Sequence, residues 1–132
     1  MISDVGGWVL DTGALLAYAN ADFYLQSVVR SCRRRGRTLL VSGLSLREAL
    51  QGRPDVDQLA EALAELLNDP STVLAEPAEG DAVALREQVR RTGGDVTAAH
   101  VAYLAAQRRW PVLSDRPGQL SVAGHTLFVE PV

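Results

Sequence analysis

The chain has 132 residues, of which 47% are hydrophobic, and a formal net charge of −3. This length and composition predict one globular domain, residues 1–132, and exclude a disordered chain. Its apolar runs are all shorter than the ~18 residues of a membrane span, and residues 1–4 lack the basic start of a signal peptide. The single cysteine, Cys32, has no partner for an internal disulfide. We therefore expect a cytoplasmic protein that does not enter a membrane.

Apolar runs and helical periodicity alternate along the first half of the chain. Residues 8–10 are an apolar run that predicts a strand, and residues 14–36 carry apolar side chains at helical spacing, which predicts one or two helices. A second apolar run, residues 38–41, predicts the second strand. Ser45, followed three residues later by Glu48, resembles a capping box that opens the next helix.

The second half continues the same alternation. We expect a helix, a short strand, two helices, a strong strand and one or two short terminal strands, at residues 56–68, 72–77, 79–92, 96–109, 111–115 and 120–129. Asp95 is the expected N-cap of the helix over 96–109. Strands that alternate with helices predict an α/β fold with a parallel sheet and helices on both faces.

Acidic residues follow the expected strands at one edge of this sheet. Asp11 ends the first strand beside Thr12, and Asp115 ends the strand over 111–115 beside Ser114. Two further acids lie at or near the starts of helices that follow loops on the same edge. Because ligands bind outside the carboxyl ends of parallel strands, we expect these acids to share one crevice. The four are Asp11, Glu48, Asp95 and Asp115.

Four carboxylates in one crevice repel one another unless a cation joins them. Mg²⁺ and Mn²⁺ prefer hard oxygen ligands and leave positions for water and phosphate. Such a cation polarises a phosphodiester and lowers the pKa of a water that attacks it. The pattern therefore predicts a Mg²⁺ or Mn²⁺ site for phosphodiester hydrolysis, with Thr12 and Ser114 orienting the carboxylates.

Each of these residues also has a purely structural interpretation. Glu48 and Asp95 are placed to cap helices, and Asp115 is placed to begin a turn with residues 116–118. Thr12 is a candidate N-cap of the helix that follows it, and Gly13 a candidate for a tight backbone turn. Asp11 is the hardest to explain by packing, because it directly follows an apolar strand.

Three stretches resemble the motifs of PIN domains, in particular those of the VapC-type toxins of toxin–antitoxin pairs. Residues 9–16, VLDTGALL, resemble the opening motif. Residues 45–49, SLREA, resemble the second motif, in which a Glu begins a helix after the second strand. Residues 112–115, VLSD, resemble the last motif, and the likeness extends from residue 8 to about residue 120.

The resemblance implies a PIN-like three-layer α/β/α sandwich with a central, mostly parallel sheet. It implies a metal-dependent endoribonuclease that is inhibited by a small antitoxin protein and forms a homodimer. The catalytic metal ligands that it implies are Asp11, Glu48, Asp95 and Asp115. The third motif departs from the usual pattern, because Ala98 stands where the acid is expected and Asp95 lies one helical turn earlier.

Arginines and one histidine are further candidates for contact with RNA. Arg33, Arg34 and Arg35 form a basic cluster that is suited to phosphates, although they equally suit the negative end of a helix dipole. His100 lies on the helix that Asp95 begins, where it either contacts RNA or a metal-bound water, packs at the edge of the core, or lies on a dimer surface.

Two other function classes remain open. A degenerate PIN domain that binds RNA or a protein partner without catalysis is consistent with the displaced third acid. The residues LDTGA at 10–14 also match the signature of aspartic proteases, in which two Asp share a proton. Those folds consist mostly of strands, whereas this chain is rich in helical patterns. A haloacid-dehalogenase-type phosphatase fits less well, because Gly13 stands where its second Asp is required.

Overall fold

The computed structural model describes residues 6–115 and 129–131. Helices and strands alternate along this part of the chain. Their order is β1 (Gly7–Leu10), α1 (Thr12–Ala19), α2 (Phe23–Arg35), β2 (Thr38–Ser42), α3 (Gly43–Leu50), α4 (Val56–Leu67), β3 (Thr72–Ala75), the 3-10 turn η2 (Glu79–Asp81), α5 (Ala82–Arg91), α6 (Val96–Arg108), β4 (Val112–Ser114) and β5 (Val129–Pro131). In the described ranges no helix is long and apolar enough to cross a membrane.

The strands form one parallel sheet. Over the described residues it has five strands in the order β3-β2-β1-β4-β5, and every neighbouring pair is parallel. β1 is central, with β2 on one side and β4 on the other. The chain therefore places β2 and β3 on one side of β1 and later places β4 and β5 on the other side. The strand order reverses between β1 and β4, so the space beyond the carboxyl ends of these two strands is the switch point of the topology.

Alternate residues of the strands point into two separate cores. Leu10, Leu39 and Leu113 pack with the buried side chains of α1, α2, α3 and α4. Val9 and Leu40 point to the opposite face and pack with buried side chains of α6. This period of two, with both faces apolar, is the reason that the strands read as continuous hydrophobic runs in the sequence.

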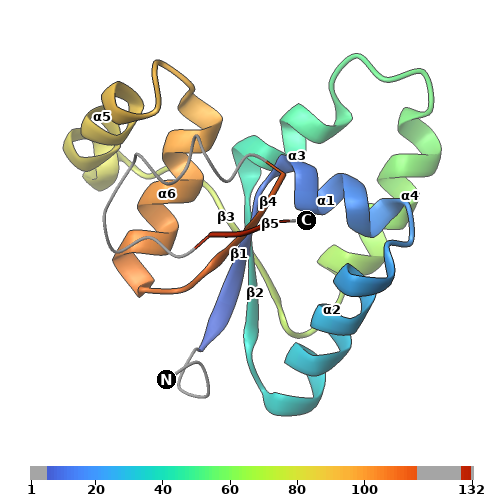
Figure 1. The fold of residues 1–132 in the computed structure, drawn as a ribbon. Coiled ribbons are helices and arrows are strands. Elements are labelled where there is room, and N and C mark those ends of the chain that lie inside the picture. The colour runs from blue at the N-terminus through green and yellow to red at the C-terminus, as the bar shows by residue number, and fades with distance from the viewer. Residues whose placement is uncertain (1–5, 116–128, 132) are drawn as a thin grey trace.

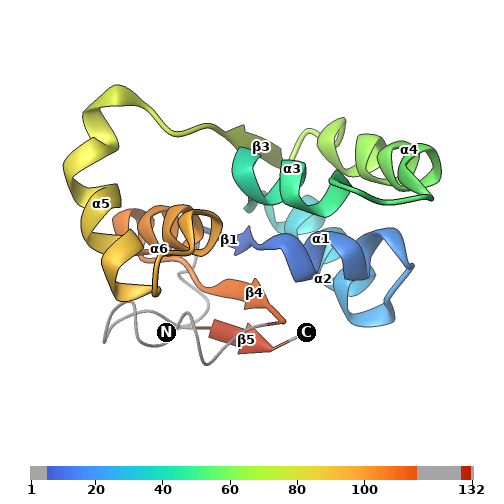
Figure 2. The same ribbon diagram turned by 90° about the horizontal axis from the view of Figure 1, so that it is seen from above.

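The helices accordingly form a layer on each side of the sheet. Figures 1 and 2 show α1 to α4 on one side and α5 and α6 on the other. α5 has no buried residue and packs against α6. The predicted three-layer α/β/α architecture with a parallel sheet is confirmed, and the mostly-strand architecture of aspartic proteases is excluded.

Several expected boundaries differ in the structure. The helical region 14–36 is two helices, because the chain turns at Ala21, whose φ is 59°, and Asp22 then caps α2. The helix expected over 79–92 begins as the turn η2 and continues as α5. Of the strands expected over 120–129, residue 129 begins β5 and the rest lies outside the described residues.

Candidate functional site

Polar residues lie at the carboxyl ends of three neighbouring strands, at one level of the sheet. Leu10 pairs with Val41 of β2 and with Leu113 of β4. The residues that come next on these strands are Asp11, Ser42 and Ser114. They lie at the carboxyl edge of the sheet, on either side of the switch point, and all three are buried.

Asp11 is held from two directions. The Ala14 N–H donates to Oδ1 of Asp11 (N···O 3.0 Å), so Asp11 is the N-cap of α1. The Ser114 hydroxyl donates to Oδ2 of Asp11. A carboxylate that is only 7% exposed requires such donors, because burial without them is costly. Asp11, rather than Thr12, therefore caps α1, and the expectation that the Thr12 hydroxyl does so is wrong.

Asp115 reaches the same place from β4. A Cβ atom built on Gly13 would lie 2.1 Å from Cγ and 2.3 Å from Oδ1 of Asp115, so this carboxylate lies directly against the Gly13 backbone. Gly13 is the second residue of α1 and is not among the positive-φ glycines. It is therefore needed for space rather than for a tight turn, which corrects the interpretation from sequence.

Glu48 lies in the second turn of α3, not at its start. α3 begins at Gly43, and Ser42 is its N-cap, with Oγ accepting from the Ser45 N–H (N···O 3.3 Å). The predicted capping box of Ser45 and Glu48 is wrong, because the hydroxyl of Ser42, the last residue of β2, already caps α3. Ser45 is instead buried inside the helix. Glu48 is half-buried, on a helix that packs against α1.

Asp95 caps α6, as predicted, by accepting from the Ala98 N–H (N···O 3.0 Å). α6 runs antiparallel to the strands, because Trp110, just past its end, packs on Gly7 at the start of β1, whereas His100 in its second turn contacts Ser42 at the end of β2. The start of α6 therefore lies at the carboxyl edge.

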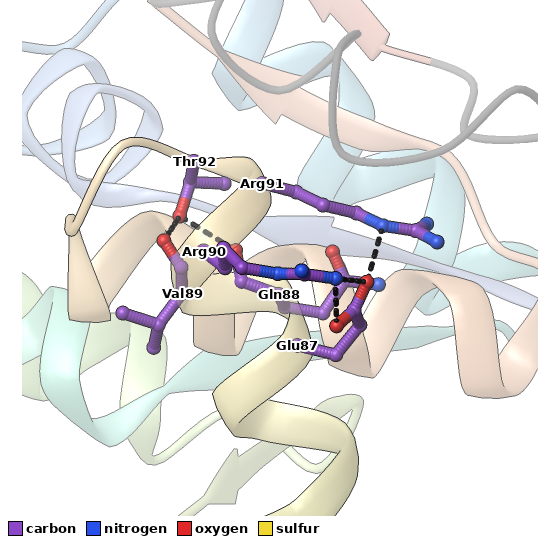
Figure 3. A network of polar contacts seen from close by, with 6 residues as sticks. All are labelled: Glu87, Gln88, Val89, Arg90, Arg91 and Thr92. Atoms are coloured by element: carbon purple, nitrogen blue, oxygen red, sulfur yellow. Dashed lines mark hydrogen bonds and ion pairs between the residues drawn. The ribbon is translucent and has the colours of Figure 1, made fainter.

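The connection between α5 and α6 is held by its own hydrogen bonds. Figure 3 shows the Thr92 hydroxyl bonded to the carbonyl oxygens of Gln88 (2.8 Å) and Val89 (3.3 Å) at the end of α5. The same hydroxyl donates to the carbonyl oxygen of Asp95 (3.1 Å). On α5, Glu87 pairs with Arg90 and Arg91 (Figure 3). Thr92 thus fixes the backbone of Asp95, the N-cap of α6.

The four predicted acids do not form a closed cage. Asp11 and Asp115 both lie at the start of α1, whereas Glu48 and Asp95 approach the edge from α3 and α6. Among the described residues, no group of three or more His, Cys, Asp or Glu side chains is close enough to hold a metal ion by itself. The Thr12 hydroxyl is buried and has no hydrogen-bond partner among the residues that the structure describes.

His100 and Ser42 form a second polar contact at this edge, which sequence reasoning missed. Nδ1 of His100 lies 2.7 Å from Oγ of Ser42, and the histidine is fully buried. Burial lowers the pKa of His100, and the charge of Arg47 adds to this, against the opposing effect of Glu76 and Asp81. Nε2 of His100 has no hydrogen-bond partner among the described residues. His100 is thus a core residue. The feature of the sequence that could have pointed to Ser42 is a hydroxyl directly after the apolar run over residues 38–41.

The basic cluster lies at the other end of the sheet. Arg33, Arg34 and Arg35 are the last residues of α2 and precede the start of β2, whereas Asp11 and Asp115 follow the ends of strands. Nε of Arg33 also donates to Oδ2 of Asp69 (2.8 Å), a carboxylate with 3% of its side chain exposed. The arginines and the acids therefore do not belong to one compact site.

Comparison with known proteins identifies the fold. No family model and no curated protein matches the sequence. Solved structures do match, among them VapBC2 from Rickettsia felis, bound to a DNA fragment from its promoter, and PAE2754 from Pyrobaculum aerophilum. The first has a TM-score of 0.70 at 15% identity and covers 95% of this chain and 98% of that chain. The second has a TM-score of 0.63 at 19% identity and covers 95% and 91%.

These likenesses extend over nearly the whole chain and, at such low identities, concern the fold. What they show for this chain is its fold, a PIN-like α/β/α sandwich. This confirms the fold that the resemblance of the three sequence motifs implied.

Proposed function

We propose that this protein is a Mg²⁺- or Mn²⁺-dependent endoribonuclease and the toxin of a toxin–antitoxin pair. The observation that carries the proposal is the pairing of Asp11 with the end of β4. Asp11, a buried carboxylate at the switch point, accepts a hydrogen bond from the Ser114 hydroxyl. A second carboxylate, Asp115, lies against the Gly13 backbone in the first turn of α1. Asp11 also caps α1, but two carboxylates at the same helix start are more than a cap requires, and the pair is suited to hold a cation.

The donor set fits such a cation. Mg²⁺ in phosphate-processing sites uses one or two carboxylates and completes its shell with water and substrate phosphate. Asp11 and Asp115 would supply those carboxylates. Each carboxylate oxygen has two lone pairs, so the bonds from Ala14 and Ser114 leave Asp11 able to coordinate. When bound, the metal supplies Lewis-acid polarisation of the phosphodiester.

The protein's own residues orient and extend the site. Ser114 fixes the rotation of the Asp11 carboxylate, which is the role expected of a residue that orients a ligand. Glu48 and Asp95, on the helices that flank the edge, would act as further ligands, to the same cation or to a second one that neutralises the RNA phosphate. Thr12, whose hydroxyl has no hydrogen-bond partner in the described ranges, is free to orient water.

A partner protein is part of the proposal. VapBC2, which shares the fold over 95% of this chain, was crystallised as a complex on promoter DNA. We therefore propose a small antitoxin as the partner that inhibits this chain, and a homodimer as its assembly. Co-expression with the antitoxin should be needed to recover active protein, and harmless overexpression of the chain alone would count against toxicity.

The direct test is RNA cleavage by purified protein with Mg²⁺ or Mn²⁺. Asp11→Asn should abolish cleavage, because the amide removes the charge that a hard cation requires. Asp22→Asn is the matched control, since Asp22 caps α2 in the same way, by accepting from the Leu25 N–H (3.0 Å). Asp22 lies beyond the far end of α1 from Asp11, and this helix is about 12 Å long. Equal cleavage by wild type and Asp11→Asn would contradict the proposal.

One observation favours a second candidate, a PIN-like domain that binds RNA without cutting it. Ala98 stands at the usual third acid, and Asp95 uses its carboxylate to cap α6. RNA binding that is unchanged by chelation of metal, together with no cleavage by wild type at any concentration of Mn²⁺, would establish this candidate instead.

A further inference from the structure

Gly13 has an unusual environment for a helical glycine. It is buried in the first turn of α1, and the three atoms nearest to a Cβ built on it all belong to Asp115. They are Cγ at 2.1 Å, Oδ1 at 2.3 Å and Cβ at 2.5 Å. The clash therefore involves the root of the Asp115 side chain and not only its flexible tip.

The backbone on either side of this contact is fixed. The Asp11 N–H donates to the Leu113 carbonyl oxygen (3.2 Å), and the Ser114 hydroxyl donates to Asp11. Residue 115 is thus attached to a strand end that is itself joined to the start of α1. Because these bonds limit how far the two backbone segments can separate, a side chain at position 13 must displace the Asp115 side chain.

We propose that Gly13 is a positioning residue of this site: the absence of a side chain there allows the Asp115 carboxylate to lie beside Asp11 at the start of α1. A carboxylate is stabilised next to the first turn of a helix, which favours this position even without a cation. This inference rests on the proposed function, in which Asp11 and Asp115 together hold the metal. It adds that residue 13 decides whether the pair can form.

A double-mutant cycle on thermal stability, measured without metal, tests the contact. Ala is a better helix former than Gly, and the φ of Gly13 is not in the positive range, so Gly13→Ala should raise the Tm where space allows. In the wild-type background it should lower the Tm. In the Asp115→Gly background, which removes the obstructing Cβ as well as the carboxylate, it should raise the Tm or leave it unchanged.

Gly80→Ala is the matched control. Among the described residues no atom lies within 4 Å of a Cβ built on Gly80, so this substitution should not lower the Tm in either background. A loss of stability from Gly13→Ala that is equal in both backgrounds would overturn the proposed contact. The outcome does not depend on whether the protein is a nuclease.

Affinity for Mn²⁺, measured by calorimetry on the same variants, tests the consequence for the site. Gly13→Ala should weaken binding by about tenfold or more, as loss of a positioning contact does at other metal sites. In the Asp115→Gly background it should cause no further loss. Unchanged affinity in Gly13→Ala would overturn the positioning role. Absence of Mn²⁺ binding by the wild type would instead contradict the proposed function, and the stability cycle would still decide the contact.

Discussion

At the scale of single residues, the carboxyl edge contains two buried ionisable groups, and a serine contacts each. Asp11 accepts from Ser114, and His100 contacts Ser42. The two differ in their hydrogen bonds. Asp11 accepts from two donors, whereas Nε2 of His100 has no partner in the described residues, so burial favours the neutral ring.

The lowered pKa of His100 predicts a pH dependence of stability. Because the folded protein keeps this ring neutral below the ordinary histidine pKa of about 6.5, the unfolded chain binds more protons in that range. The contribution is complete above pH 6.5 and is lost as the pH falls below it, by at most about 1.4 kcal/mol per pH unit. Urea unfolding between pH 7.5 and 5 should show a shallower pH slope in His100→Gln than in wild type. Identical slopes would mean that the ring titrates normally.

At the scale of elements, Ser42, the last residue of β2, performs two tasks. Its hydroxyl caps α3 and contacts His100 of α6, which joins helices that lie on opposite faces of the sheet. α3 is eight residues long and carries the candidate ligand Glu48, so its start needs a cap.

Ser42→Ala should therefore cost about 1–3 kcal/mol of unfolding free energy, because it removes a cap and leaves a buried ring nitrogen unpaired. The control is Asp55→Ala, since Asp55 precedes α4 and makes no side-chain cap bond. That substitution should change stability by less than about 0.5 kcal/mol. Chemical denaturation of both variants checks the difference, and equal losses would mean that the Ser42 contacts contribute little.

The elements also show what sequence patterns predict and what they miss. The strand over 8–10 and the cap at Asp95 were predicted because periodicity and capping are local properties of the chain. The capping box at Ser45 was wrong, because a hydroxyl three residues earlier competed for the same role and only the end of β2 decides between them. The contact of Asp115 with Gly13 joins residues far apart in sequence, so no local pattern contains it.

The candidate site was predictable only as a set of residue types at strand ends. Parallel strands bring Asp11 and Asp115 to one edge, which the alternating pattern implied. The rotation of each carboxylate, and the distance of Glu48 and Asp95 from the pair, depend on helix packing. Arg33 was grouped with the RNA contacts by charge, but the fold places it at the far end of the sheet, beside Asp69.

At the scale of the whole molecule, β1 lies at the centre of the sheet, between the two cores. Asp11 and Asp115 therefore lie at the switch point, where the strand order reverses between β1 and β4. The cation that we propose there would bind the folded chain and not the unfolded one. Free Mn²⁺ at one hundred times its Kd should therefore add about 2.7 kcal/mol to the unfolding free energy and raise the Tm by several degrees. Asp11→Asn should lose this shift, whereas Asp22→Asn should retain it. An equal shift in both variants would place the bound metal elsewhere.

The central claim is that carboxylates from the ends of β1 and β4 hold one hard cation. The most direct measurement is a crystal soaked in Mn²⁺, with the metal located by its anomalous scattering. We predict a peak within coordination distance of both Asp11 and Asp115, at the start of α1. A crystal with no peak at that edge, or with a peak that touches neither carboxylate, would contradict the account.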